Sequence, residues 1–291
     1  MPLQAFFHPA PDGGQRLYLH HAPEGGAAAR HALVYLHPWA EEMNKSRRMA
    51  ALASRALAAD GHAVLQPDLK GCGDSSGDFG QASWDDWLDD TLRAVAWMRE
   101  RHPGADLWLW GLRSGALLAA AAAAAPELDG ERPSLLFWQP STQGKAVLQQ
   151  FLRLKAAAQL ADGGGKAILA AARADLAAGR PVQVAGYALA PALASGLEAA
   201  QLTPPARAGG PARRAVWLDV SQQPNGQPSP ATQAALERWR GAGWQVDART
   251  VPGPAFWQTT EIEEAPALVA ATRSCLASAP WAHDPSHGLP A

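Results

Sequence analysis

The 291-residue chain has little cysteine, no excess of basic residues and no long hydrophobic run. Its two cysteines, Cys72 and Cys275, are too few for a disulfide framework or a cysteine-based metal cluster, which favours a reducing compartment. The formal net charge of −2 argues against a nucleic-acid partner. The alanine-rich stretch 116–125 is too short and too weakly apolar to span a bilayer.

The first residues, MPLQAFFHPAPDGG, have neither a basic segment nor a long apolar core, so we expect no signal peptide and a cytoplasmic protein. With 47% hydrophobic and 18% charged residues, the chain can bury a large core. We expect no membrane span, metal or cofactor. The sequence leaves the oligomeric state open.

Short apolar runs alternate with segments of helical period along most of the chain. The helical segments include 46–61 and 83–101, which each place apolar side chains on one face. Alternation of this kind predicts a mostly parallel sheet with helices on both faces. The candidate strands are 5–9, 16–20, 31–37, 62–68, 106–111, 134–139, 215–220 and 244–251.

The alternation stops after the sixth candidate strand. Residues 141–205 are rich in Ala and Leu and contain helical stretches at 147–160 and 191–202. We therefore predict an α/β core made of 1–140 and 206–278, a helical lid insertion over 141–205, and a flexible tail over 279–291.

Three segments carry a recognisable order of motifs: LVYLHPWAEEMNKSRR, QPDLKGCGDSSG and LWGLRSGALLA, beginning at residues 33, 66 and 109. Together they resemble the α/β-hydrolase superfamily, in which the third segment is the G-x-S-x-G turn that carries a nucleophilic serine. The resemblance implies the α/β-hydrolase fold.

A narrower resemblance runs from about residue 5 to residue 277. It rests on HPWAEEMNKSRRMAALASRALAADGHAVLQPDLKGCGDSSGDF, LWGLRSGALLA, QQFLRLKAA, VAGYALAPAL and FWQTTEIEEAPALVAAT. These segments are similar to the second of the two hydrolase families found with the exosortase A system. That similarity implies a bacterial setting of PEP-CTERM protein sorting and exopolysaccharide production, and it implies no substrate.

The turn lacks the serine that the superfamily places at its tip. Gly111 and Gly115 flank Arg113, which therefore occupies the nucleophile position. Ser114 is a poor substitute, because Leu112 would crowd a turn centred on it. The backbone N–H groups of Trp39 and Ser114 are the candidate oxyanion-hole donors.

The acid and the histidine of a Ser-His-Asp triad also lack clear equivalents. Asp219 lies within a predicted strand, whereas Asn225 is nearer the loop in which the acid is expected. The loop after the last strand holds Phe-Trp-Gln at 256–258 and no histidine, and His283 and His287 belong to the predicted tail. The sequence therefore assigns no catalytic residue.

Polar side chains remain around the expected mouth of the site. The candidate pocket residues are Arg113, His37, Glu41, Glu42, Asn44, Lys45, Gln139, Trp257 and Gln258. Several have a plainer interpretation. Asn44 or Ser46 suits an N-cap behind the two acids, and His37 suits loop orientation better than base catalysis. Either glutamine can satisfy local backbone groups, and Cys72, between two glycines, suits packing.

Arg113 itself has two interpretations. It can anchor a carboxylate or phosphate at the start of a helix, or it can form an internal ion pair with Glu41 or Glu42. Two functional hypotheses follow. One is a hydrolase or acyl-transfer enzyme without a serine nucleophile, which activates water through His37, Glu41 or Glu42. The other is a pseudoenzyme that binds an anionic metabolite, a glycan precursor or a partner protein.

Overall fold

The computed structural model describes residues 3–158, 164–206, 213–223 and 226–277. Its main sheet has eight strands in the order β1-β2-β4-β3-β5-β6-β9-β10. Strand β2 is antiparallel to its neighbours β1 and β4, and the others run parallel, so all eight predicted strands and the mostly parallel sheet are confirmed. The strands are β1 (Gln4–Pro9), β2 (Gln15–His21), β3 (His31–Leu36), β4 (Ala63–Pro67), β5 (Asp106–Leu112), β6 (Ser134–Trp138), β9 (Arg214–Ser221) and β10 (Gln245–Pro252).

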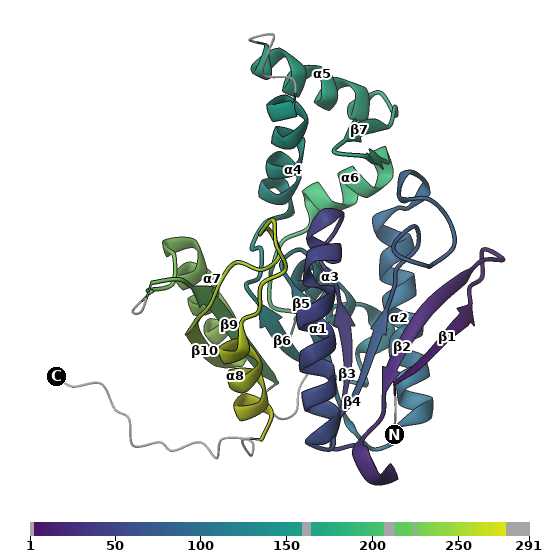
Figure 1. Cartoon of the computed structure of the whole chain (residues 1–291), viewed down its shortest axis with the longest axis vertical. Coiled ribbons are helices and arrows are strands. Elements are labelled where there is room, and N and C mark those ends of the chain that lie inside the picture. Colours follow the sequence, from purple (N-terminus) through teal and green to yellow (C-terminus); the bar gives the residue numbers. More distant parts are fainter. Residues whose placement is uncertain (1–2, 159–163, 207–212, 224–225, 278–291) are drawn as a thin grey trace.

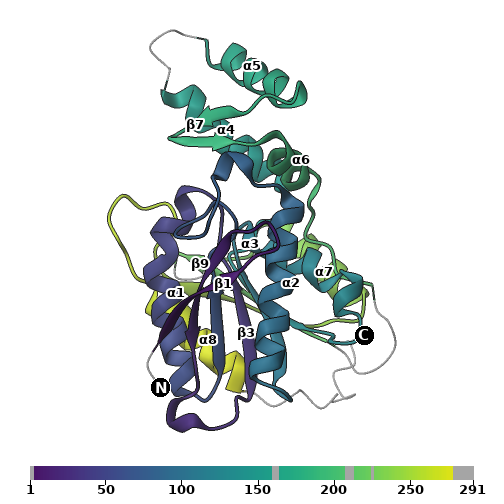
Figure 2. The same cartoon turned by 90° about the vertical axis from the view of Figure 1, so that its right-hand side faces the viewer.

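Helices cover both faces of this sheet (Figures 1 and 2). Helices α1 (Glu41–Ala59) and α8 (Pro266–Ala277) bury Met49, Leu57 and Leu276 against one face, where Trp108 and Trp110 of β5 lie. Helices α2 (Trp84–Arg101), α3 (Gly115–Ala123) and α7 (Pro230–Gly241) cover the other face. The described residues also contain three short 3-10 turns, Glu24–Gly26, Phe79–Gln81 and Pro126–Leu128.

An insertion lies between β6 and β9, outside the main sheet (Figure 1). It consists of α4 (Gly144–Ala158), α5 (Gly165–Ala177), β7 (Val182–Val184), β8 (Tyr187–Leu189) and α6 (Pro191–Ala199). Helices α4 and α6 lie where the sequence predicts helical stretches, whereas α5 lies between the two predicted stretches. The β7–β8 hairpin was not predicted; its strands are three residues long, and the positive φ angles of Ala185 and Gly186 make its turn.

Two further predictions concern membrane-spanning helices and the C-terminal tail. In the part of the chain that is described, no helix is long and apolar enough to cross a membrane. The predicted tail, 279–291, lies outside the described residues.

Several histidines are buried in the core of the fold. Burial lowers the pKa of His20, His21 and His62 from 6.5 to about 4 in each case. His62 is 1% exposed and its ring stacks on His31 with 4.8 Å between the ring centroids. Both rings thus pack as neutral groups.

Because burial lowers the pKa of these histidines, we expect the free energy of unfolding to depend on pH. Between pH 6.5 and about 4 the unfolded chain binds a proton at His62 that the folded chain does not, so stability falls as the pH falls through this window. In His62→Gln, the slope of unfolding free energy against pH should decrease by about 1.4 kcal/mol per pH unit between pH 4.5 and 6. Urea unfolding at several pH values measures it.

The slope separates titration from packing, because any packing loss in His62→Gln is present equally at pH 8. An unchanged slope would mean that His62 is protonated in the folded protein.

Candidate functional site

The turn between β5 and α3 has the geometry of a nucleophile elbow. Arg113, at its tip, has a φ of +54°, in the left-handed region. A Cβ on Gly111 would collide with the backbone of Ala116, and one on Gly115 would collide with the carbonyl oxygen of Leu36. Both positions therefore need glycine, because neighbouring backbone lies too close to leave room for a side chain. The sequence predicts this for a turn centred on residue 113.

The Arg113 side chain makes an internal ion pair. Its Nε and Nη2 atoms each lie 3.4 Å from a carboxylate oxygen of Glu42, in the first turn of α1. Its guanidinium also lies over the ring of Trp257, 5.4 Å from the centroid. Of the two interpretations of Arg113, the structure contains the ion pair, and the partner is Glu42 rather than Glu41.

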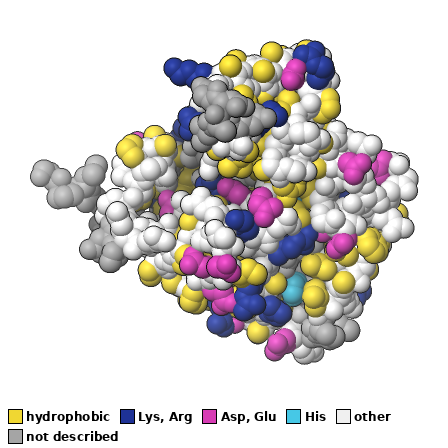
Figure 3. Space-filling view, turned by 45° about the horizontal axis from the view of Figure 1, so that its top comes forward, with side chains coloured by type: hydrophobic (Ala, Val, Ile, Leu, Met, Phe, Trp, Pro, Cys, Tyr) yellow, Lys and Arg dark blue, Asp and Glu magenta, His cyan; other side chains and the backbone are white. Residues whose placement is uncertain are grey.

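The ion pair between Arg113 and Glu42 is loose. A charge-assisted hydrogen bond between nitrogen and oxygen is usually about 2.7–2.9 Å long. The two side chains are 17% and 22% exposed. Burial raises the pKa of the Glu42 carboxyl, and the attraction of Arg113 only partly opposes this effect. Figure 3 shows side chains of both charges gathered on the surface below the insertion.

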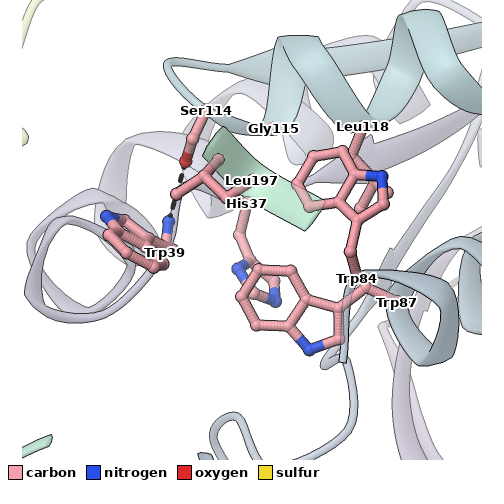
Figure 4. Close-up of a pocket in the computed structure, with 8 residues that line it drawn as sticks. All are labelled: His37, Trp39, Trp84, Trp87, Ser114, Gly115, Leu118 and Leu197. Atoms are coloured by element: carbon pink, nitrogen blue, oxygen red, sulfur yellow. Dashed lines mark hydrogen bonds between the residues drawn. The ribbon is translucent and has the colours of Figure 1, made fainter. Parts of the chain in front are cut away.

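Ser114 does not point towards a base. Its Oγ accepts a hydrogen bond of 3.1 Å from the backbone N–H of Trp39, and both residues are buried (Figure 4). One of the two predicted oxyanion-hole donors is therefore engaged by the hydroxyl of the other residue. This contact ties the loop after β3 to the start of α3.

His37 orients the loop that carries Trp39. Its Nδ1–H donates to the Pro38 carbonyl oxygen over 2.7 Å, and its Nε2 accepts from the Leu69 N–H over 3.4 Å. Burial lowers the pKa of the ring, which favours the neutral form. Because both ring nitrogens are engaged, the geometry supports the loop-orienting interpretation over the base.

Packed aromatic side chains close the space beside His37. The space does not admit a water molecule. Figure 4 shows the rings of Trp84 and Trp87 beside His37 and the indole of Trp39 on the other side. The residues that line it are His37, Trp39, Trp84, Trp87, Ser114, Gly115, Leu118 and Leu197.

The predicted N-cap at the start of α1 is wrong. The helix begins at Glu41, so Asn44 and Ser46 lie inside it, and the N-cap is Ala40 with a φ of +50°. The reason is electrostatic: two acids in the first turn complement the helix dipole without an N-cap side chain. Ser46 instead donates to the Glu42 carbonyl oxygen.

Residues of the first helical turns contact the insertion and the C-terminal loop. The Tyr187 hydroxyl donates to Glu41 over 3.2 Å and accepts from the Asn44 amide over 3.1 Å. Lys45 Nζ donates to the Thr259 carbonyl oxygen over 2.8 Å. The sequence analysis did not single out Tyr187, because no local pattern marks a lone tyrosine in a short hairpin.

The remaining candidate residues are Gln139, Trp257, Gln258 and Cys72, and only Gln258 is exposed. Gln139 has a φ of +41° and its side-chain oxygen accepts from the Val220 N–H, so it satisfies a strand backbone as the plainer interpretation expects. Gln258 is exposed, whereas Trp257 is buried beneath Arg113. Cys72 is buried, and burial raises the pKa of its thiol, which suits packing.

Of the residues considered for the acid and the histidine of a triad, the structure describes only Asp219. Asp219 lies in β9 and accepts from the Trp217 indole N–H over 3.2 Å; burial raises the pKa of Asp219 to about 6. Asn225, His283 and His287 lie outside the described residues. Among the described side chains, no group of three or more His, Cys, Asp or Glu residues could hold a metal ion.

Known proteins share this architecture. A family model described as serine aminopeptidase, S33, matches residues 27–161. Est1E from Butyrivibrio proteoclasticus, solved with ferulic acid, is 14% identical with a TM-score of 0.67, and the match covers 94% of this chain and 98% of that one. The chain has the α/β-hydrolase fold.

Two other solved structures with this fold extend the comparison. A soluble variant of monoglyceride lipase from Saccharomyces cerevisiae is 12% identical, with a TM-score of 0.62 and coverage of 95% and 96%. XC6422 from Xanthomonas campestris, an α/β serine hydrolase without a lid, is 19% identical, with a TM-score of 0.52 and coverage of 95% and 93%. No curated protein matches the sequence.

The elbow geometry predicts the response to a probe for activated serines. A fluorophosphonate should leave the protein unlabelled, because the tip residue is Arg113 and the Ser114 hydroxyl points at Trp39. Intact-mass spectrometry measures the labelling, with a known serine hydrolase as the positive control. Stoichiometric modification of Ser114 would contradict this expectation.

Proposed function

We propose that this α/β-hydrolase-fold protein works in the exosortase A system of bacteria and binds an anionic small molecule at Arg113. The resemblance over residues 5–277 supports the setting, which is PEP-CTERM protein sorting and exopolysaccharide production. The observation that carries the binding function is a guanidinium at the tip of a preserved nucleophile elbow. A protein that used serine chemistry would need a hydroxyl there.

The surroundings of Arg113 suit a carboxylate or phosphate. Arg113 lies two residues before α3, next to its N-cap Ser114, and the first N–H groups and the dipole of this helix favour negative charge. Trp257 supports one face of the guanidinium, so the planar fork is held in place before a ligand arrives. Two parallel hydrogen bonds to one anion would then fix its orientation as well as its charge.

Glu42 competes with the ligand for the same guanidinium. At 3.4 Å its contacts are longer than those an incoming anion can make. Its carboxylate is also disfavoured by burial, which raises its pKa above the ordinary value of 4.5. Protonation of Glu42 leaves Arg113 with its full charge available. Anion affinity should therefore increase as the pH falls towards the pKa of Glu42.

Sulfate is a suitable probe of this competition, because it stays a dianion from pH 5 to pH 8. Its affinity for the natural protein should increase as the pH falls. In Glu42→Gln, sulfate should bind more tightly at pH 8 and lose most of this pH dependence. In Arg113→Met, affinity should fall about tenfold or more, as expected when a hydrogen bond to a charged group is lost. Isothermal titration calorimetry measures all three.

Methionine keeps an apolar stem against Trp257, so Arg113→Met tests the charge more than the packing. The two variants must move sulfate affinity in opposite directions. Equal affinity in all three proteins, with a lower unfolding temperature in Arg113→Met, would show that Arg113 only fills the former catalytic position.

A second candidate function is hydrolysis by an activated water, and one observation favours it. Burial raises the pKa of Glu42, and a carboxylate of raised pKa beside a cation is a plausible general base. Glu42 would take a proton from water while the water oxygen attacks the carbonyl carbon. As the bond from that carbon to the leaving group breaks, Glu42 would return the proton to the leaving group. The Ser114 hydroxyl would first have to release the Trp39 N–H.

Turnover separates the two candidates. Hydrolysis of short-chain esters or thioesters that disappears in Glu42→Gln would support the second. Sulfate binding with no hydrolysis in any of the three proteins would support the first.

A further inference from the structure

The outermost strand of the main sheet has an apolar exposed face. Along β1 and the residue before it, the more exposed positions are Leu3, Ala5, Phe7 and Pro9, which alternate with more buried ones. Leu3 is 48% exposed and Phe7 is 53% exposed. Leu17 and Leu19 of β2 lie opposite Phe7 and Ala5 and are partly exposed. We call these six side chains the β1 patch.

The other face of β1 is already covered. Phe6 packs against Trp97 of α2 with 5.2 Å between ring centroids, and His8 stacks on Tyr18 at 5.0 Å. Figure 2 shows β1 at the front of the sheet, between α1 and α2 and with no helix in front of it. The β1 patch is therefore an uncovered face made by the edge strand β1 and the adjoining part of β2.

The free edge of β1 offers main-chain groups at the same residues. Leu17 N–H donates to the Ser75 hydroxyl and Leu17 C=O accepts from the Asp68 N–H, so both groups point away from β1. Its partner Phe7 is thus in a non-hydrogen-bonded pair, and Phe7 N–H and C=O point to the free edge. By alternation, those of Ala5 point there too.

We infer that two copies of this chain pair through β1, antiparallel across a twofold axis, and join their sheets. Centred on Phe6, this pairing puts Ala5 of each copy opposite Phe7 of the other. These residues would exchange the backbone hydrogen bonds that are free at the edge. The large ring of Phe7 would pack over the small Ala5 side chain of the other copy, and the two β1 patches would form one continuous apolar surface.

Charge and sequence favour a second copy as the partner. Strand β1, QAFFHP, has no charged side chain, so two copies in antiparallel register oppose no like charges. It lacks the edge lysines that usually prevent such pairing, and Pro9 lies at the end of the strand. The tail of this chain suits the edge less well: Pro280, Pro285 and Pro290 interrupt it, and proline cannot donate to a ladder.

Sedimentation velocity from about 1 to 100 µM tests the pairing. The natural protein should associate to a dimer with increasing concentration. Phe7→Lys should stay a monomer, because the lysines of the two copies would lie diagonally across the strand pair, where like charges repel each other, and the apolar contact of Phe7 with Ala5 would be lost. Ile262→Lys is the matched control, since Ile262 is 71% exposed in a loop outside β1. This variant should still form dimers. Phe7→Lys should keep its circular dichroism spectrum, since that side chain is exposed.

Hydrogen exchange at Ala5 and Phe7 gives a second measurement. Protection of both amides should increase with protein concentration and be absent in Phe7→Lys. A protein that stays a monomer at 100 µM would overturn the inference. So would amides whose protection is independent of concentration and is lost when residues 278–291 are removed, because the tail would then be the occupant.

Discussion

The site depends on how closely α3 approaches the ends of β3 and β5. There is no room for a Cβ at residue 111 or at residue 115. The chain between them turns sharply, and residue 113 takes a left-handed conformation that costs a non-glycine residue about 1 kcal/mol or more. This cost is independent of the side chain's chemistry, so the turn presents an arginine from the position where a hydrolase presents a serine.

The exchange of serine for arginine changes what the neighbouring positions can do. A serine nucleophile needs an imidazole from the loop after the last strand. In this chain the same loop places the ring of Trp257 against the Arg113 guanidinium. The N-terminal turn of α1 provides a carboxylate, Glu42, which pairs with the guanidinium. The hydroxyl of Ser114 engages the Trp39 N–H. Each of these contacts differs from what a serine nucleophile requires, and this is why we propose that the site recognises charge.

Much of this arrangement could be predicted from residue order, and the rest depends on tertiary contacts. The strands follow from apolar periodicity, and the elbow follows from Gly111 and Gly115. The choice between a ligand anchor and an ion pair at Arg113 depends on where α1 begins. It begins at Glu41, earlier than an N-cap at Asn44 or Ser46 would imply, because Ala40 adopts a positive φ that sequence patterns do not signal. The β7–β8 hairpin escaped prediction because three-residue strands have too little alternation to detect.

The same first turn of α1 links the elbow to the insertion. Glu41 accepts from Tyr187 of the hairpin, and the next residue, Glu42, pairs with Arg113. Two consecutive residues of a helix share one rigid backbone, so a displacement of this turn changes both contacts at once. Glu41 is exposed and its bond to Tyr187 is 3.2 Å long, whereas Glu42 is largely buried. The contact to the hairpin is therefore the shorter and the more solvent-exposed of the two, so the elbow and the insertion are joined through the exposed side of this helical turn.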